Sequence, residues 1–203
     1  RAYESSGGDW EQQLLMTADA ADLGGEFATD SNEVAGLVAE GYTVERVHLG
    51  QDEGEYTAPG ARERLLTALA EGRSFVNFFG HSGHGAIGND SLLSVSDVPG
   101  LVNGEHLPVI TAFTCEAGQF GRPGQESIAE SLVIAPGGGA VAMWSSSGLS
   151  LSHRAKLLGK GFYSATFGAG ELVIGEAILR AQAAYARDGV DKYLLDTYNL
   201  IGD

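Results

Sequence analysis

The chain has 203 residues, of which 43% are hydrophobic and 19% charged, which is the composition of a globular domain. The sequence has no apolar run of the roughly 20 residues that a membrane-spanning helix needs. Its formal net charge of -15, with only 12 Lys and Arg residues, argues against nucleic acid or anionic lipid as a partner and would favour cationic substrates instead. The single cysteine excludes an intrachain disulfide and a thiolate zinc cluster.

Apolar and amphipathic segments alternate in the first part of the chain. The expected elements are, in order, a strand over 13–18, a helix over 30–40, a strand over 43–49, a helix over 61–70 and a strand over 74–80. The first helix is expected to begin at an N-cap formed by Asp30 or Ser31. This alternation indicates a parallel sheet with helices on its faces.

The second part of the chain continues the pattern after a long interruption. Residues 84–107 read mostly as loop and short helix, and so long a connection in a compact domain is typical of a functional segment. The expected elements that follow are a strand over 108–114, a helix over 126–134, a strand over 140–144 and helices over 152–167 and 171–187. In the helix over 126–134, the residues expected to face the sheet are Ile128, Leu132 and Ile134.

The length suits one domain that spans 1–203. The chain begins at Arg1 without a methionine or a signal sequence, so we expect it to be a piece of a longer protein.

Reactive side chains directly follow two of the predicted strands. His81 comes after the strand over 74–80, and Cys115 comes after the strand over 108–114. Open α/β sheets place ligands and reactive groups at the carboxyl ends of their strands. A histidine at one strand end and a lone thiol at the next is the layout that a cysteine nucleophile with a histidine base requires.

Each of these residues also has a plainer interpretation. A free cysteine most often fills core space, but Cys115 stands at a strand end, where its sulfur can face a cleft. The pair His81 and His84 could suggest zinc, yet zinc needs three or four ligands and the remaining histidines are scattered, so no metal or cofactor is predicted. Asp19, Glu116 and Asp203 are interpreted as ordinary surface carboxylates. A flavodoxin-like nucleotide or flavin binder fits the element order but lacks a phosphate loop.

Several short motifs together resemble those of the gingipain-like cysteine peptidases of family C25, in the caspase-like clan. The matching segments, spread over nearly the whole chain, are residues 18–20, 76–81, 107–110, 114–115, 138–142 and 198–203. The resemblance implies an α/β fold of the caspase-like type, a three-layer sandwich whose mostly parallel sheet has helices on both faces. Family members are often secreted or envelope-associated, so it also implies an extracellular or cell-envelope location.

The same resemblance implies a cysteine endopeptidase that cleaves peptide or protein substrates through a covalent acyl-enzyme. Cys115 would be the nucleophile and His81 the base. Backbone amides of Ser82, Gly83 and Cys115 would hold the substrate carbonyl oxygen. The loop after the strand over 140–144 would form a wall of the pocket for the residue preceding the cut, with Trp144, Ser145, Ser146 and Ser147.

One departure from the family pattern leaves the choice of histidine open. The family's histidine is followed directly by glycine, whereas Ser82 follows His81 and the His-Gly dipeptide here is His84-Gly85. His81 is favoured because it stands directly behind a rigid strand. The alternative function is a catalytically silent caspase-like interaction or secretion-associated module of a larger protein, and the sequence does not predict an oligomeric state.

Overall fold

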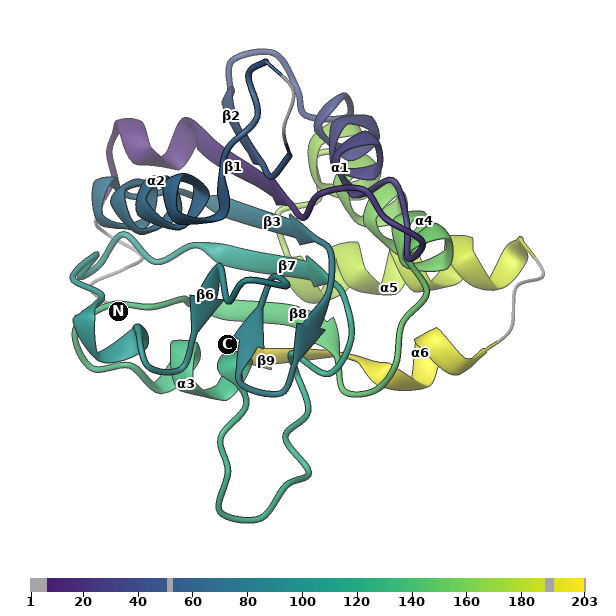
Figure 1. Ribbon diagram of the computed structural model, residues 1–203. Helices are drawn as coiled ribbons and strands as arrows, with labels where there is room; N and C mark the ends of the chain where they lie inside the picture. Colours follow the sequence, from purple (N-terminus) through teal and green to yellow (C-terminus); the bar gives the residue numbers. More distant parts are fainter. Residues whose placement is uncertain (1–6, 51–52, 189–191, 203) are drawn as a thin grey trace.

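A computed structural model describes residues 7–50, 53–188 and 192–202, so Asp203 of the last family-like segment lies outside the described residues. Its main sheet has six strands in the order β2-β1-β3-β7-β8-β9 (Figure 1). All neighbouring pairs are parallel except β8 with β9. The strands are β1 (Gln13–Ala18), β2 (Thr43–His48), β3 (Phe75–Phe79), β7 (Val109–Phe113), β8 (Ala142–Ser146) and β9 (Tyr198–Gly202). The predicted parallel sheet is confirmed.

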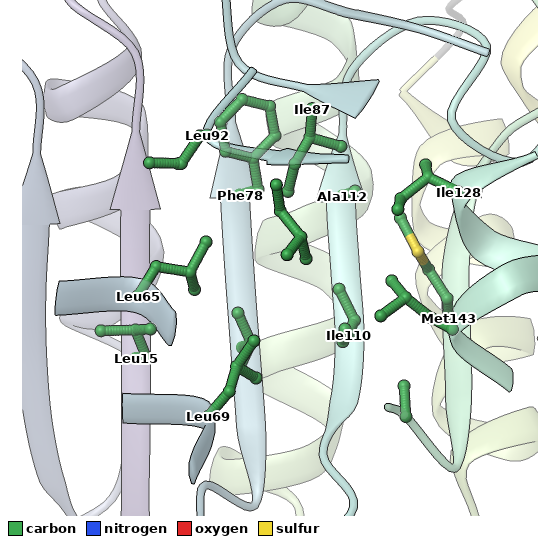
Figure 2. Close-up of a cluster of buried hydrophobic side chains, with 14 of the residues drawn as sticks. Leu15, Leu65, Leu69, Phe78, Ile87, Leu92, Ile110, Ala112, Ile128 and Met143 are labelled. Carbon is green, nitrogen blue, oxygen red and sulfur yellow. The ribbon is translucent and has the colours of Figure 1, made fainter. Parts of the chain in front are cut away.

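Helices cover both faces of this sheet and make the three layers. One face carries α2 (Ala58–Glu71) and α3 (Ile128–Ile134), and the other carries α1 (Phe27–Ala35), α4 (Ser152–Tyr163) and α5 (Ile174–Arg187). A short helix, α6 (Tyr193–Thr197), leads into β9. Figure 2 shows the core on the α2 and α3 face, in which Leu65 and Leu69 of α2 lie over the strands that carry Leu15 and Phe78. None of the helices in the described part of the chain is long and apolar enough to cross a membrane.

Helix α1 begins three residues before the expected N-cap, at Phe27. Asp30 and Ser31 lie inside the helix and are buried. The Asp30 carboxylate accepts a hydrogen bond from Ser152 Oγ at 2.7 Å and pairs with Lys156 Nζ at 2.8 Å, both from α4. The N-cap prediction was therefore wrong, because partners on another helix satisfy the carboxylate.

Helix α3 begins with a capping box that the sequence did not single out. Ser127 Oγ accepts from the Glu130 amide at 3.3 Å, and the Glu130 carboxylate accepts from the Ser127 amide at 2.8 Å. Ile128 and Leu132 are buried against the sheet as expected. Ile134 is instead 62% exposed, because it is the last residue of a helix of only 7 residues and lies past the sheet-facing side.

The segment after β3 is mostly turns and loop with one short 3-10 helix, as predicted, and it also contains short strands that were not predicted. It forms a small antiparallel sheet of β4 (Ser82–Gly83), β5 (Ala86–Ile87) and β6 (Leu93–Ser94), followed by a 3-10 turn over Val98–Gly100. Ile87 packs into the main core near Phe78 (Figure 2). Arg62 of α2 binds both carboxylate oxygens of Asp97 and lowers the pKa of that carboxyl to about 2. Strands of two residues are too short to show a period of alternation, so the sequence did not predict them.

Strand β8 starts and ends two residues later than predicted. Its last residues, Ser145 and Ser146, are fully buried and pair with Asn199 and Tyr198 of β9. Serine is not typical of strands, but the added antiparallel partner satisfies the backbone there and extends the strand. Helix α4 continues into a π-helical turn over Ser164–Gly168, and α5 begins at Ile174, close to the expected ends of both helices.

Candidate active site

The two predicted reactive residues lie at the carboxyl ends of paired strands. Strands β3 and β7 are hydrogen-bonded neighbours, with Phe79 beside Phe113 at their last positions. His81 is the second residue after β3, and Cys115 is the second residue after β7. The structure therefore brings both residues to the same edge of the sheet, which is the edge where such folds place their ligands.

The segment that follows β8 holds the sulfur of Cys115. This residue is partly exposed, and its Sγ accepts a hydrogen bond from the Ser150 amide at 3.3 Å and lies 3.5 Å from the Ser150 carbonyl oxygen. The next residue, Glu116, has a φ of 48° and donates its amide to the Gly148 carbonyl at 2.9 Å. A positive φ in a residue other than glycine is strained and turns the chain sharply away from the strand. Among the described residues, the Cys115 amide itself donates no hydrogen bond.

The imidazole of His81 is oriented by an aspartate that sequence reasoning missed. His81 Nε2 lies 3.0 Å from Asp22 Oδ2, and the edge of the ring packs against Phe27 at 5.0 Å between ring centroids. Asp22 also accepts from the Gly24 amide at 2.7 Å, and this bond, followed by the bond to His81, lowers the pKa of the Asp22 carboxyl. The loop of Gly24 and Gly25 after the first strand was the sequence signal that could have directed attention to Asp22.

Asp19 is a buried anchor for the backbone of the site. It is only 1% exposed, so its interpretation as a surface carboxylate was wrong. Its carboxylate accepts from the amides of His81 at 2.8 Å and Asn89 at 3.2 Å. Burial raises the pKa of Asp19 above its usual value. A side chain at Gly80 would come within 2.5 Å of this carboxylate, so the glycine lets the chain pass close to Asp19.

Ser82 connects the end of β3 to the segment that carries Cys115. Its hydroxyl donates to the Cys115 carbonyl oxygen. Thr114 Oγ1 lies 2.8 Å from both Ser82 Oγ and the Gly80 carbonyl oxygen, which joins the ends of β3 and β7. Gly83 follows on β4 and is exposed.

His84 occupies the turn between β4 and β5 and differs from His81 in its surroundings. Its carbonyl oxygen accepts from the Ile128 amide at 2.9 Å, which places it beside the start of α3. Both of its ring nitrogens are buried and have no hydrogen-bond partner within the described residues. In that same part of the chain, no hydrogen bond joins Cys115 to the ring of either His81 or His84. Apo active sites often have such loose geometry.

The complete sequence, residues 1–203, matches the sequence profile of peptidase family C25. The chain belongs to peptidase family C25. Membership of this family places it among the cysteine-type peptidases.

Solved structures share the fold of this C25 chain. The Arg-specific cysteine proteinase gingipain R (RgpB) superposes with a TM-score of 0.81 at 23% identity over 96% of this chain and 47% of that one. The complex of Porphyromonas gingivalis RgpB pro- and mature domains gives 0.78 at 22% identity over 96% and 48%. A structure described as a protease gives 0.77 at 19% identity over 99% and 49%. At such identities the likeness establishes the caspase-like gingipain fold alone, and the chain spans about half the length of these proteins. No curated protein sequence matches it.

The pocket wall expected from the family lies deeper than predicted. Trp144, Ser145 and Ser146 have no exposed surface, because Trp144 belongs to the core between the sheet and α4. These residues underlie the site rather than line it. Ser147 is partly buried and its hydroxyl donates to the Thr197 carbonyl oxygen at 3.0 Å. The exposed part of the segment begins at Leu149, which is 67% exposed.

Within the described ranges 7–50, 53–188 and 192–202, no group of three or more His, Cys, Asp or Glu side chains could hold a metal ion.

Replacing Gly24 with alanine is expected to disturb catalysis without unfolding the C25 domain. An added Cβ would stand 2.7 Å from His81 Cε1, so the imidazole would have to move away from Asp22. We expect the kcat/KM of peptide cleavage to fall by roughly 10-fold or more, because His81 as the candidate base would tolerate little displacement. Peptide cleavage and thermal unfolding would be measured together. The matched control is Gly100→Ala, an exposed position where no atom lies within 4 Å of the added Cβ; equal losses in the two variants would contradict the expectation.

Proposed function

We propose that this chain forms the catalytic core of a cysteine endopeptidase, in which Cys115 is the nucleophile and His81 the general base. The observation that carries the proposal is the pairing of β3 with β7, whose neighbouring ends lead to His81 and Cys115. The bond from Ser82 Oγ to the Cys115 carbonyl ties these two ends together. Membership of family C25 supports a peptidase reaction on protein substrates.

The reaction begins when His81 takes the proton of the Cys115 thiol and the sulfur attacks the carbonyl carbon of the substrate. The tetrahedral intermediate collapses as the carbon–nitrogen bond breaks, and His81 gives the proton to the leaving amine. A thioester acyl-enzyme remains. His81 then deprotonates a water molecule, which attacks the thioester, releases the acid product and restores the thiol.

Backbone amides would stabilise the negative oxygen of the intermediate. The Cys115 amide has no acceptor among the described residues and is therefore available to a substrate oxygen. Ser82 and Gly83 are the proposed further donors, since they lie on the segment that Ser82 fastens to Cys115. The His81 amide is excluded from this role because it donates to Asp19.

Asp22 is the proposed positioning residue for the base. Its carboxylate faces His81 Nε2, and the Gly24 amide fixes the carboxylate in turn. With Nε2 held by Asp22, the other ring nitrogen, Nδ1, is the atom that would exchange protons with the thiol. The carboxylate selects the tautomer and stabilises the imidazolium that forms during the reaction.

Asp22→Asn is expected to lower kcat at least about 10-fold with little change in KM, because the amide can present its N–H to the ring and favour the wrong tautomer. Asp22→Glu should recover part of the loss, since it restores a carboxylate. Steady-state kinetics on one peptide substrate would measure both variants. A loss confined to KM, or equal losses in the two variants, would argue against a positioning role.

The function is tested by incubating the full-length protein that carries this chain with reduced casein and identifying products by mass spectrometry. We expect internal cleavage that iodoacetamide abolishes and a chelator leaves intact. Absence of any cleavage would favour the catalytically silent module instead. On the family resemblance alone, we also propose an extracellular or cell-envelope location.

A further inference from the structure

An apolar depression lies immediately beside the sulfur of Cys115. Its volume is about 650 Å³, and it is formed by the segment between β8 and α4, the first turn of α4 and helix α6. Figure 1 shows α6 next to the chain that runs from β8 to α4. The residues that line it are Leu149, Ser150, Leu151, Arg154, Tyr193 and Leu194. The volume lies within the range of roughly 300 to 1,000 Å³ that small-ligand pockets occupy.

Hydrogen bonds fix the walls of this depression. The Tyr193 hydroxyl accepts from the Leu149 amide at 3.2 Å and fits over Gly148, where a side chain would come within 2.6 Å of it. Ser150 Oγ lies 2.9 Å from the buried Tyr198 hydroxyl. The same Ser150 contacts Cys115 Sγ through both its amide and its carbonyl. One residue is therefore shared by the nucleophile and the wall of the depression.

Because Ser150 contacts both the sulfur and the depression, the part of a substrate that would enter the depression can be inferred. The carbonyl carbon of the scissile peptide bond must approach to about 3 Å from the sulfur. The side chain nearest to that carbon is the one on the residue that supplies the carbonyl group. Because Ser150 touches the sulfur and Leu149 and Leu151 flank Ser150, that side chain is the one brought to this depression. A larger depression of about 800 Å³ under residues 120–126 does not include Ser150, the residue that contacts the sulfur, among its lining residues.

The chemistry of the lining favours an apolar side chain. Leu149 and Leu151 are 67% and 57% exposed, and covering such surface releases about 25 cal/mol for each Å². Arg154 is the one charged residue among the described lining residues, and the lining has no carboxylate that could pair with a basic side chain. The nearby Asp30 carboxylate is buried and already paired with Lys156.

We propose that the depression of Leu149, Leu151 and Tyr193 is a specificity pocket for a large apolar side chain, such as Leu, Met or Phe. This side chain belongs to the substrate residue that supplies the attacked carbonyl, so the proposal rests on the proposed peptidase function. The net charge of the chain would favour cationic substrates, but charge spread over the surface acts on encounter, whereas the pocket lining acts on the bound side chain. In this respect the chain is expected to differ from the Arg-specific proteinase whose fold it shares.

The full-length protein would be given matched peptides that differ only at this residue, carrying Leu, Phe, Arg or Glu, and kcat/KM would be measured for each. We expect Leu and Phe to exceed Arg by at least about 10-fold. Preference for Arg would overturn the inference and point to Glu116, beside the nucleophile, as the counter-ion. Equal rates would also overturn it.

Leu149→Asp should lower cleavage of the Leu peptide by at least about 10-fold and raise the relative rate of the Arg peptide. The matched control is Leu172→Asp, because Leu172 is 84% exposed and lies in a depression with Phe75, at the opposite ends of the strands. An unchanged preference in Leu149→Asp would refute the pocket while leaving the peptidase intact. Absence of Cys115-dependent cleavage of every peptide would instead overturn the proposed function together with this inference.

Discussion

Cys115→Ala in the full-length protein is expected to reduce peptide cleavage by at least about 1,000-fold, because no other residue can form the acyl-enzyme. The folded state should be nearly unaffected, with a change in the free energy of unfolding of about 1 kcal/mol or less. The side chain is small and partly exposed, and its sulfur contacts only the Ser150 backbone through hydrogen bonds. Initial cleavage rates and thermal unfolding of the same preparation would measure both effects.

Cys115→Ser is the matched control because it preserves the size of the side chain and replaces the thiol with a poorer nucleophile. It should be as inactive as the alanine variant. Full activity in either variant would remove cysteine catalysis from consideration. Large unfolding in the alanine variant would assign Cys115 to the core instead.

His81→Ala is expected to lose at least 100-fold in kcat/KM, in line with the roughly 10²- to 10⁴-fold contribution of a general base. His81 follows a rigid strand, its amide is held by Asp19 and its ring by Asp22. The whole residue is therefore fixed at the strand end, as a base requires.

His84→Ala is the paired variant, and it should lose much less. His84 lies in the turn between β4 and β5, and its backbone is tied to Ile128 rather than to the nucleophile segment. Both ring nitrogens are buried and have no partner in the described part of the chain, so the substitution should affect packing and stability more than the rate of cleavage. Reversed losses would make His84-Gly85 the His-Gly motif of this family member.

The sequence predicted the parts of the fold that depend on long buried strands. The strands that end at Phe79 and Phe113 are continuous apolar runs, and their parallel neighbours place His81 and Cys115 at one edge. Helices α1 to α5 were all predicted, but their ends differ by up to five residues, the largest difference being at α1, which ends at Ala35 instead of Glu40. Where their ends differ, as at Asp30, the cause is a partner from a distant helix that a local pattern cannot reveal.

The support around the reactive residues could not be predicted in the same way. Asp22 and Asp19 reach His81 across about 60 residues of sequence, and Ser150 reaches Cys115 across 35. These contacts depend on how loops from different strands meet at the edge of the sheet. The family resemblance implied that Trp144 lies at the pocket wall, but in this chain its side chain packs into the core. The positive φ of Glu116 could not be predicted either, because glutamate, unlike glycine, does not indicate such a backbone conformation.

The central claim, that His81 activates Cys115, is tested most directly by the rate at which iodoacetamide alkylates the thiol at about pH 7. The single cysteine in this chain makes the mass of its alkylated tryptic peptide a reading of Cys115 alone. We predict that the unmodified sequence reacts at least about 10-fold faster than His81→Ala and at nearly the same rate as His84→Ala. Equal rates for the unmodified sequence and His81→Ala, or a selective loss in His84→Ala, would contradict the account.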